Sequence, residues 1–205
     1  KEYFRSHDVE AIYVGHPLLE SITSFLSEKA SISVPLKTGQ KLVALLPGSR
    51  KQEIEKMLPV MLEAISNYTD LKAVIAGAPN IDRSFYMRFM DRYPSVVLIE
   101  NKTYEILKVA DLALVTSGTA TLETALFGVP MLVLYKGNPI SYSIAKRFVK
   151  IKYISLVNLI LDQPILKELI QHDVNVKNLM VEIKALKKEE ETARQKAAFQ
   201  KLEHF

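Results

Sequence analysis

The 205-residue sequence predicts an α/β fold in which a Rossmann-like parallel sheet carries helices on both faces. Short apolar runs alternate with segments of helical periodicity, a pattern typical of parallel strands joined through helices. Each run also ends in a small or polar loop, such as PGSR at 47–50 and TSGT at 116–119. Because ligands bind at the carboxyl edge of open α/β sheets, we expect a binding site at these loops.

The individual elements follow from the apolar pattern in chain order. AIYVG at 11–15 predicts a first strand, and the polar stretch 26–40 predicts a connection. Apolar β-rich runs predict the later strands, at 41–46, 72–76, 96–99, 112–115 and 131–134. Apolar residues at helical spacing predict the helices, at 51–67, 82–92, 103–109, 141–149 and 165–172, with a short helix before Gly128 and Pro130.

We expect one domain over residues 1–175, followed by a helical tail over 176–205. Hydrophobic residues make up 48% of the chain, which suffices for one α/β core of this length. The tail is charged and favours helix, with Leu179, Ile183, Leu186 and Ala193 on one face. No apolar run reaches the roughly 18–20 residues of a transmembrane helix.

The charge balance favours anionic partners. The net charge is +4, which suits an anionic ligand or an anionic membrane surface. Nucleic acid is not an expected partner, because the lysines are scattered and no aromatic-basic RNA motif occurs. Basic and aromatic residues gather only between 136 and 153. That stretch is either an amphipathic helix with a solvated face or a membrane contact.

The segment TSGTATLE at 116–123 is the strongest candidate for chemistry. A turn of small residues between a strand and a helix exposes backbone N–H groups at the positive end of the helix, which suits a phosphate or diphosphate. Glu123, about one helical turn further on, can accept hydrogen bonds from paired sugar hydroxyls. The alternative is a tight turn and an amphipathic helix with an exposed glutamate.

A second candidate turn is PGSR at 47–50. Gly48 lets a ligand approach the backbone, Ser49 can cap the next helix, and Arg50 offers a fork that matches phosphate oxygens. An ordinary turn with an exposed arginine remains the alternative. Glu53 is expected to cap the helix start rather than to act as an acid. Asn158, in an apolar run, is either a hydrogen-bonded core amide or a ligand contact.

Several enzyme classes are disfavoured by missing motifs. The sequence has no GxSxG elbow, no P-loop and no GxGxxG fingerprint, which argues against serine hydrolases, P-loop NTPases and nicotinamide dehydrogenases. Cysteine is absent and the four histidines show no metal-ligand spacing. We therefore expect no metal and no cofactor.

Five segments resemble the C-terminal half of the lipid-A-disaccharide synthases and together cover most of residues 11–172. They are YVGHPLLE (13–20), LLPGSRKQEIE (45–55), TSGTATLETALFGVPMLVLYK (116–136), AKRFVKIKYISLVNLIL (145–161) and QPILKELIQ (163–171). The resemblance implies the C-terminal, UDP-sugar-binding domain of a GT-B glycosyltransferase. The reaction would join UDP-2,3-diacylglucosamine to 2,3-diacylglucosamine 1-phosphate, with inversion to a β(1→6) disaccharide and release of UDP.

The resemblance also implies roles for the candidate residues. Arg50 would contact the diphosphate beside Gly48 and Ser49. The phosphate-binding turn would come from Ser117, Gly118 and Thr119, the ribose contact from Glu123, and Asn158 would line the donor pocket. No metal would take part.

The family's N-terminal domain, which should carry the acceptor site and the general base, does not match any part of this sequence. The catalytic base is therefore unknown, and we expect the chain alone to be inactive. The tail would pack on that domain or on a partner chain, with a homodimer possible. The expected location is the cytoplasmic face of the inner membrane, held by the basic stretch 136–153. The alternatives are an enzyme resembling UDP-N-acetylglucosamine 2-epimerase and a non-catalytic sugar-nucleotide-binding module.

Overall fold

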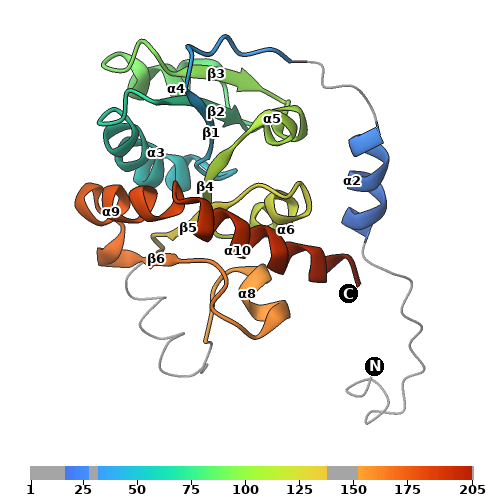
Figure 1. The fold of residues 1–205 in the computed structure, drawn as a ribbon. Coiled ribbons are helices and arrows are strands. Elements are labelled where there is room, and N and C mark those ends of the chain that lie inside the picture. The colour runs from blue at the N-terminus through green and yellow to red at the C-terminus, as the bar shows by residue number, and fades with distance from the viewer. Residues whose placement is uncertain (1–16, 28–31, 138–151, 205) are drawn as a thin grey trace.

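A computed structural model describes residues 17–27, 32–137 and 152–204. Its six strands form one parallel sheet in the order β3-β2-β1-β4-β5-β6 (Figure 1). The strands are β1 (Lys41–Leu46), β2 (Leu71–Gly77), β3 (Val97–Glu100), β4 (Leu112–Thr116), β5 (Met131–Tyr135) and β6 (Glu168–Ile170). The predicted α/β fold is confirmed. The expected strand at 11–15, the expected helix at 141–149 and most of the basic stretch lie outside the described residues.

Helices cover both faces of the sheet (Figure 1). They are α2 (Pro17–Ser27), α3 (Lys51–Ile65), α4 (Arg83–Met90), α5 (Thr103–Val109), α6 (Thr119–Leu126), α8 (Leu156–Leu161), α9 (Val176–Leu186) and α10 (Glu189–Phe199), with short 3-10 helices at Gln171–Asp173 and Gln200–His204. Within the described ranges, none of them combines the length and the apolar character needed to cross a membrane.

Successive residues of the central strands enter two separate cores, because side chains alternate between the faces of a sheet. On β1, Val43 and Leu45 belong to the core that contains residues of α3, α4 and α9. Leu42 and Ala44 belong to the opposite core, which contains residues of α5, α6, α8 and α10. The central strands β1, β4 and β5 are therefore mainly apolar, as expected for a parallel sheet buried on both faces.

The helix predicted at 165–172 is wrong. Residues Glu168–Ile170 form the edge strand β6, which pairs in parallel with Val133–Tyr135 of β5. Leu169 is buried against the sheet. Pairing with β5 satisfies backbone groups along one side of this short segment, and that tertiary contact outweighs local helix preference.

The tail is two helices rather than one. Helix α9 ends at Leu186, Lys188 has extended backbone angles, and α10 begins at Glu189. The predicted face is correct for Leu179, Ile183 and Leu186, which are buried, but Ala193 is exposed. Ala198, Phe199 and Leu202 are buried instead, in the opposite core from α9. The apolar faces of the tail thus pack on this domain itself, while a contact with a further domain or partner stays a prediction.

Candidate functional site

A pocket of about 430 Å³ opens at the carboxyl edge of the sheet, between β1 and β4. The strand order reverses there, since β2 and β3 lie on one side of β1 and β4 to β6 on the other. Such a switch point leaves a crevice in which open α/β sheets bind their ligands. The lining residues come from the ends of β1, β2 and β4, from the loops and helices that follow them, and from Thr103 at the start of α5, after β3.

Seven of the eight predicted site residues line this one pocket. The turn between β1 and α3 contributes Gly48, Ser49 and Arg50, and the segment after β4 contributes Ser117, Gly118, Thr119 and Glu123. The two turns are about 70 residues apart in the chain and meet because β1 pairs with β4. The pairing of these two strands therefore builds the site.

The turn after β1 depends on Gly48. Its φ of +116° lies in the region that favours glycine, and a Cβ there would stand 2.6 Å from both Cβ and Oε2 of Glu53. Glu53 Oε2 accepts hydrogen bonds from the N–H groups of Ser49 (3.0 Å) and Arg50 (3.3 Å). The predicted capping role of Glu53 is confirmed. A carboxylate thus already occupies N–H donors at the start of α3.

Arg50 is the positive group among the residues that line the pocket. Its side chain is 82% exposed, and its guanidinium lies 3.5 Å from Glu53 Oε1. An exposed ion pair of this kind contributes little to stability, so the guanidinium can turn toward a bound anion.

Across the described residues, no group of three or more His, Asp or Glu side chains is arranged to hold a metal ion.

The turn after β4 presents donors that nothing in the described chain uses. Ser117 is fixed, because its N–H donates to the Leu134 carbonyl and its hydroxyl to the Ile154 carbonyl, both at 2.8 Å. The N–H groups of Gly118, Thr119 and Ala120 have no hydrogen-bond partner among the residues that the structure describes. They stand at the positive end of α6. An anion in the pocket therefore finds its backbone donors at α6 rather than at α3.

Glu123 has a partner that the sequence did not reveal. The Tyr104 hydroxyl, from α5, donates to Glu123 Oε1 at 2.9 Å. Burial and this contact with a carboxylate raise the pKa of Tyr104 to about 12. The available signal was the polar loop ENKT at 100–103, which follows a predicted strand and directly precedes Tyr104. Periodicity could not show that α5 turns Tyr104 toward α6.

Thr116 belongs to the predicted segment 116–123, but the sequence assigned it no role. It is the last residue of β4, is 7% exposed and lines the pocket. Its hydroxyl is buried and has no hydrogen-bond partner within the described part of the chain. Such buried hydroxyls are rare, since most find a partner.

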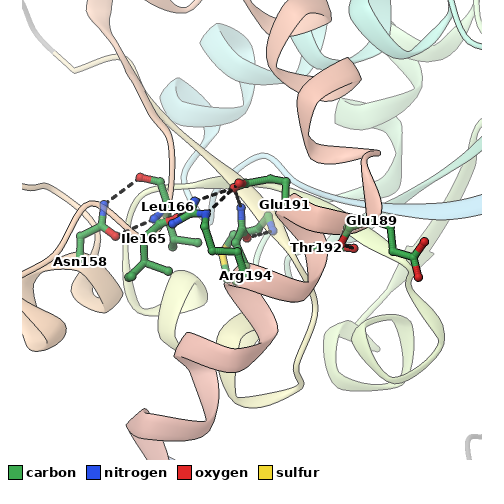
Figure 2. A network of polar contacts seen from close by, with 9 residues as sticks. Asn158, Ile165, Leu166, Glu189, Glu191, Thr192 and Arg194 are labelled. Carbon is green, nitrogen blue, oxygen red and sulfur yellow. Dashed lines mark hydrogen bonds and ion pairs between the residues drawn. The ribbon is translucent and has the colours of Figure 1, made fainter.

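Asn158 does not line this pocket. Its side chain is 1% exposed, and Figure 2 shows it in a network beside α10. The Asn158 amide donates to the Leu166 carbonyl and to Glu168 Oε1, both at 2.9 Å, and accepts from the Leu166 N–H at 2.8 Å. These bonds tie α8 to the start of β6 and to the segment before it. The structure thus shows Asn158 as a hydrogen-bonded core amide, which lines a different cavity, of about 390 Å³, together with Leu166.

The sequence comparisons point to one family. A family model described as "Lipid-A-disaccharide synthetase" matches residues 1–205. A lipid-A-disaccharide synthase of Syntrophus aciditrophicus is 36% identical over 98% of this chain and 54% of its own length. Its counterpart in Acinetobacter baylyi is 34% identical over 100% of this chain and 54% of its own. The chain spans about half the length of the curated relatives it matches.

The structural comparisons agree on the fold. The glycotransferase of kitacinnamycin superposes with a TM-score of 0.59 at 14% identity, over 86% of this chain and 43% of that one. Anabaena HepE, solved with UDP-glucose, superposes with a TM-score of 0.57 at 13% identity, over 95% of this chain and 52% of that one. A putative UDP-N-acetylglucosamine 2-epimerase of Listeria monocytogenes superposes with a TM-score of 0.51 at 18% identity, over 92% of this chain and 44% of that one. At these identities the likeness concerns the fold alone, and it is the GT-B type of α/β fold.

Proposed function

The chain belongs to the lipid-A-disaccharide synthase family, and from that premise we propose that the pocket between β1 and β4 binds the UDP-sugar donor. The observation that carries the proposal is the meeting of the two predicted turns, 47–50 and 116–119, in one pocket at the switch point of the sheet. The reaction proposed for the whole enzyme joins UDP-2,3-diacylglucosamine to 2,3-diacylglucosamine 1-phosphate.

In this proposal the chain stabilises the leaving group electrostatically. The bond between the anomeric carbon and the diphosphate breaks as an acceptor hydroxyl attacks, and the electron pair leaves with UDP. The N–H groups of Gly118, Thr119 and Ala120 and the guanidinium of Arg50 would face the charge that develops on the diphosphate. Fixed donors of this kind act most strongly where charge grows in the transition state.

Glu123 would bind the nucleoside. It lies one helical turn beyond the N–H groups at the start of α6 and lines the same pocket. A carboxylate one helical turn from the phosphate site can accept hydrogen bonds from both ribose hydroxyls, because its two oxygens are acceptors.

The proton of the acceptor hydroxyl must go to a base, and we expect that base and the acceptor site in a part of the enzyme other than these 205 residues. The chain alone is then predicted to be inactive. Association with an anionic membrane on its cytoplasmic face, through the basic stretch 136–153, and a homodimer are further parts of the proposal. Both acyl-sugar substrates are lipids, which supports a membrane location.

The epimerase alternative is less well supported. An epimerase reaction on the sugar would need acid and base side chains, with a histidine near the sugar ring. No histidine among the described residues lines the pocket. A module that binds the sugar nucleotide without reacting remains compatible with the pocket, and only assays of the complete enzyme separate it from the transferase.

Calorimetry with UDP tests the proposal. The wild-type chain should bind UDP, and Glu123→Ala should weaken binding about tenfold, or about 1.4 kcal/mol. The matched control is Glu63→Ala, since Glu63 is exposed near the end of α3 and does not line the pocket. Equal affinity in the wild type and Glu123→Ala would remove Glu123 from the site, and no binding by the wild type would refute the proposal.

A further inference from the structure

We propose that Tyr104 is a positioning residue, which holds Glu123 so that its second carboxylate oxygen receives the ribose hydroxyls of the nucleotide. The inference rests on the proposed function and adds to it the device that orients the ribose contact. Tyr104 Oη and Glu123 Oε1 are 2.9 Å apart, and the two residues come from α5 and α6.

The Tyr104 ring is held by an aromatic cluster. Phe25 of α2 lies 5.5 Å from it, centroid to centroid, in an edge-to-face contact at 71°. Phe127, at the end of α6, lies 5.2 Å from the Tyr104 ring and 6.1 Å from that of Phe25. Three rings from three segments fix one another in this way, since aromatic pairs prefer such tilted arrangements. The hydroxyl of Tyr104 is thus presented to Glu123 by a rigid frame.

Lys108 anchors the α2 side of the cluster. Its ammonium donates to the carbonyls of Phe25 (3.2 Å) and Leu26 (3.0 Å) and lies 5.6 Å from the centroid of the Phe25 ring. A cation at the last carbonyls of a helix is favourable, because the helix dipole is negative there. The end of α2 is therefore docked on α5, and with it the Phe25 ring that supports Tyr104.

The hydrogen bond leaves one carboxylate oxygen available. No hydrogen bond to Glu123 Oε2 occurs within the described residues, whereas Oε1 is occupied by Tyr104. A free glutamate would sample several rotamers and lose that freedom when ligand binds. With Oε1 fixed in advance, less ordering is needed, so the ligand binds more tightly. Tyr104 remains protonated at neutral pH, and its raised pKa is consistent with a permanent donor.

Tyr104→Phe tests the inference, because it removes only the hydroxyl and keeps the aromatic cluster. We expect UDP binding to weaken about three- to fivefold, the effect of ordering one side chain on binding. We expect 2′-deoxy-UDP to lose less, so that the preference for the ribose form falls. Tyr68→Phe is the control, since the Tyr68 hydroxyl donates to the Met180 carbonyl and does not line the pocket.

A double-mutant cycle separates positioning from a general structural effect. In the Glu123→Ala background, Tyr104→Phe should have no further effect on UDP affinity. Unchanged affinity in the single Tyr104→Phe variant, or an equal loss in both backgrounds, would overturn the inference while leaving the UDP site intact. Failure of the wild type to bind UDP would instead refute the proposed function and this inference together.

Discussion

Among single residues, Gly48 is the one whose replacement should disturb the site most directly. Alanine at this position must adopt a φ of +116°, and its Cβ would press on the carboxylate that caps α3. Strain at such angles costs about 1–3 kcal/mol. We predict that Gly48→Ala lowers the free energy of unfolding by about 2–3 kcal/mol in urea denaturation and weakens UDP binding.

Gly39 offers the matched control for this prediction. Its φ is +80°, but a Cβ there meets no atom within 4 Å. Gly39→Ala should therefore cost only about 1 kcal/mol, from the backbone angle, and leave UDP affinity unchanged. If Gly48→Ala and Gly39→Ala lowered the free energy of unfolding equally, the contact with Glu53 would be unimportant.

The raised pKa of Tyr104 predicts how the free energy of unfolding depends on pH. Its pKa is raised from 10.0 to about 12 in the folded protein. Between these values the unfolded chain has lost the Tyr104 proton and the folded chain keeps it, so stability falls as pH rises. Tyr104→Phe removes this contribution. Denaturation at about pH 9 and about pH 11 should show a shallower loss of stability in the variant than in the wild type.

Tyr104→Phe will still lose some stability as the pH rises, because burial also raises the pKa of Tyr68 and of Tyr86. Their contributions have the same sign and persist in the variant. An unchanged pH dependence in Tyr104→Phe would contradict the buried contact between Tyr104 and Glu123.

At the scale of elements, the buried side chain of Gln195 hydrogen-bonds α10 to the sheet. Gln195 is fully buried, and its Oε1 accepts the N–H of Met131 at 2.8 Å, at the first residue of β5. Leucine at this position would fill a similar volume and leave that N–H without an acceptor. We predict a cost of about 1–3 kcal/mol for Gln195→Leu, measured by urea denaturation.

The control for this contact is Gln200→Leu, because Gln200 is exposed just after α10. A change within about 0.5 kcal/mol is expected there. If the two variants lost stability equally, general features of α10 and not the bond to Met131 would account for the loss.

The elements also show where local sequence pattern fails. Strands β1 to β5 were predictable because each is a mainly apolar run between turn residues. The three residues of β6 were not, since a strand this short depends on its pairing with β5. The break between α9 and α10 lies in the run Lys187–Lys188–Glu189, where composition favours helix and only packing on the two cores sets the turn.

For the whole molecule, the sequence anticipated the turns that form the pocket but not the contacts around them. Gly48, Arg50 and Gly118 stand at ends of strands, and a parallel sheet brings such ends to one edge. Tyr104 reaches Glu123 through the packing of α5 beside α6, which no spacing along the chain encodes. Asn158 lies in one of the segments that resemble the family, and the resemblance placed it in the donor pocket. Its side chain instead hydrogen-bonds to the Leu166 backbone inside the domain.

The central claim, that the crevice between β1 and β4 holds the UDP group, is tested most directly by following backbone amide resonances during a UDP titration. The account predicts the largest shifts at Gly118, Thr119 and Ala120, with a second group around Arg50. The cavity of about 390 Å³ beside Leu166 and Arg194 serves as the internal control, and its amides should move little. Largest shifts at that second cavity, or no saturable shifts at the start of α6, would contradict the account.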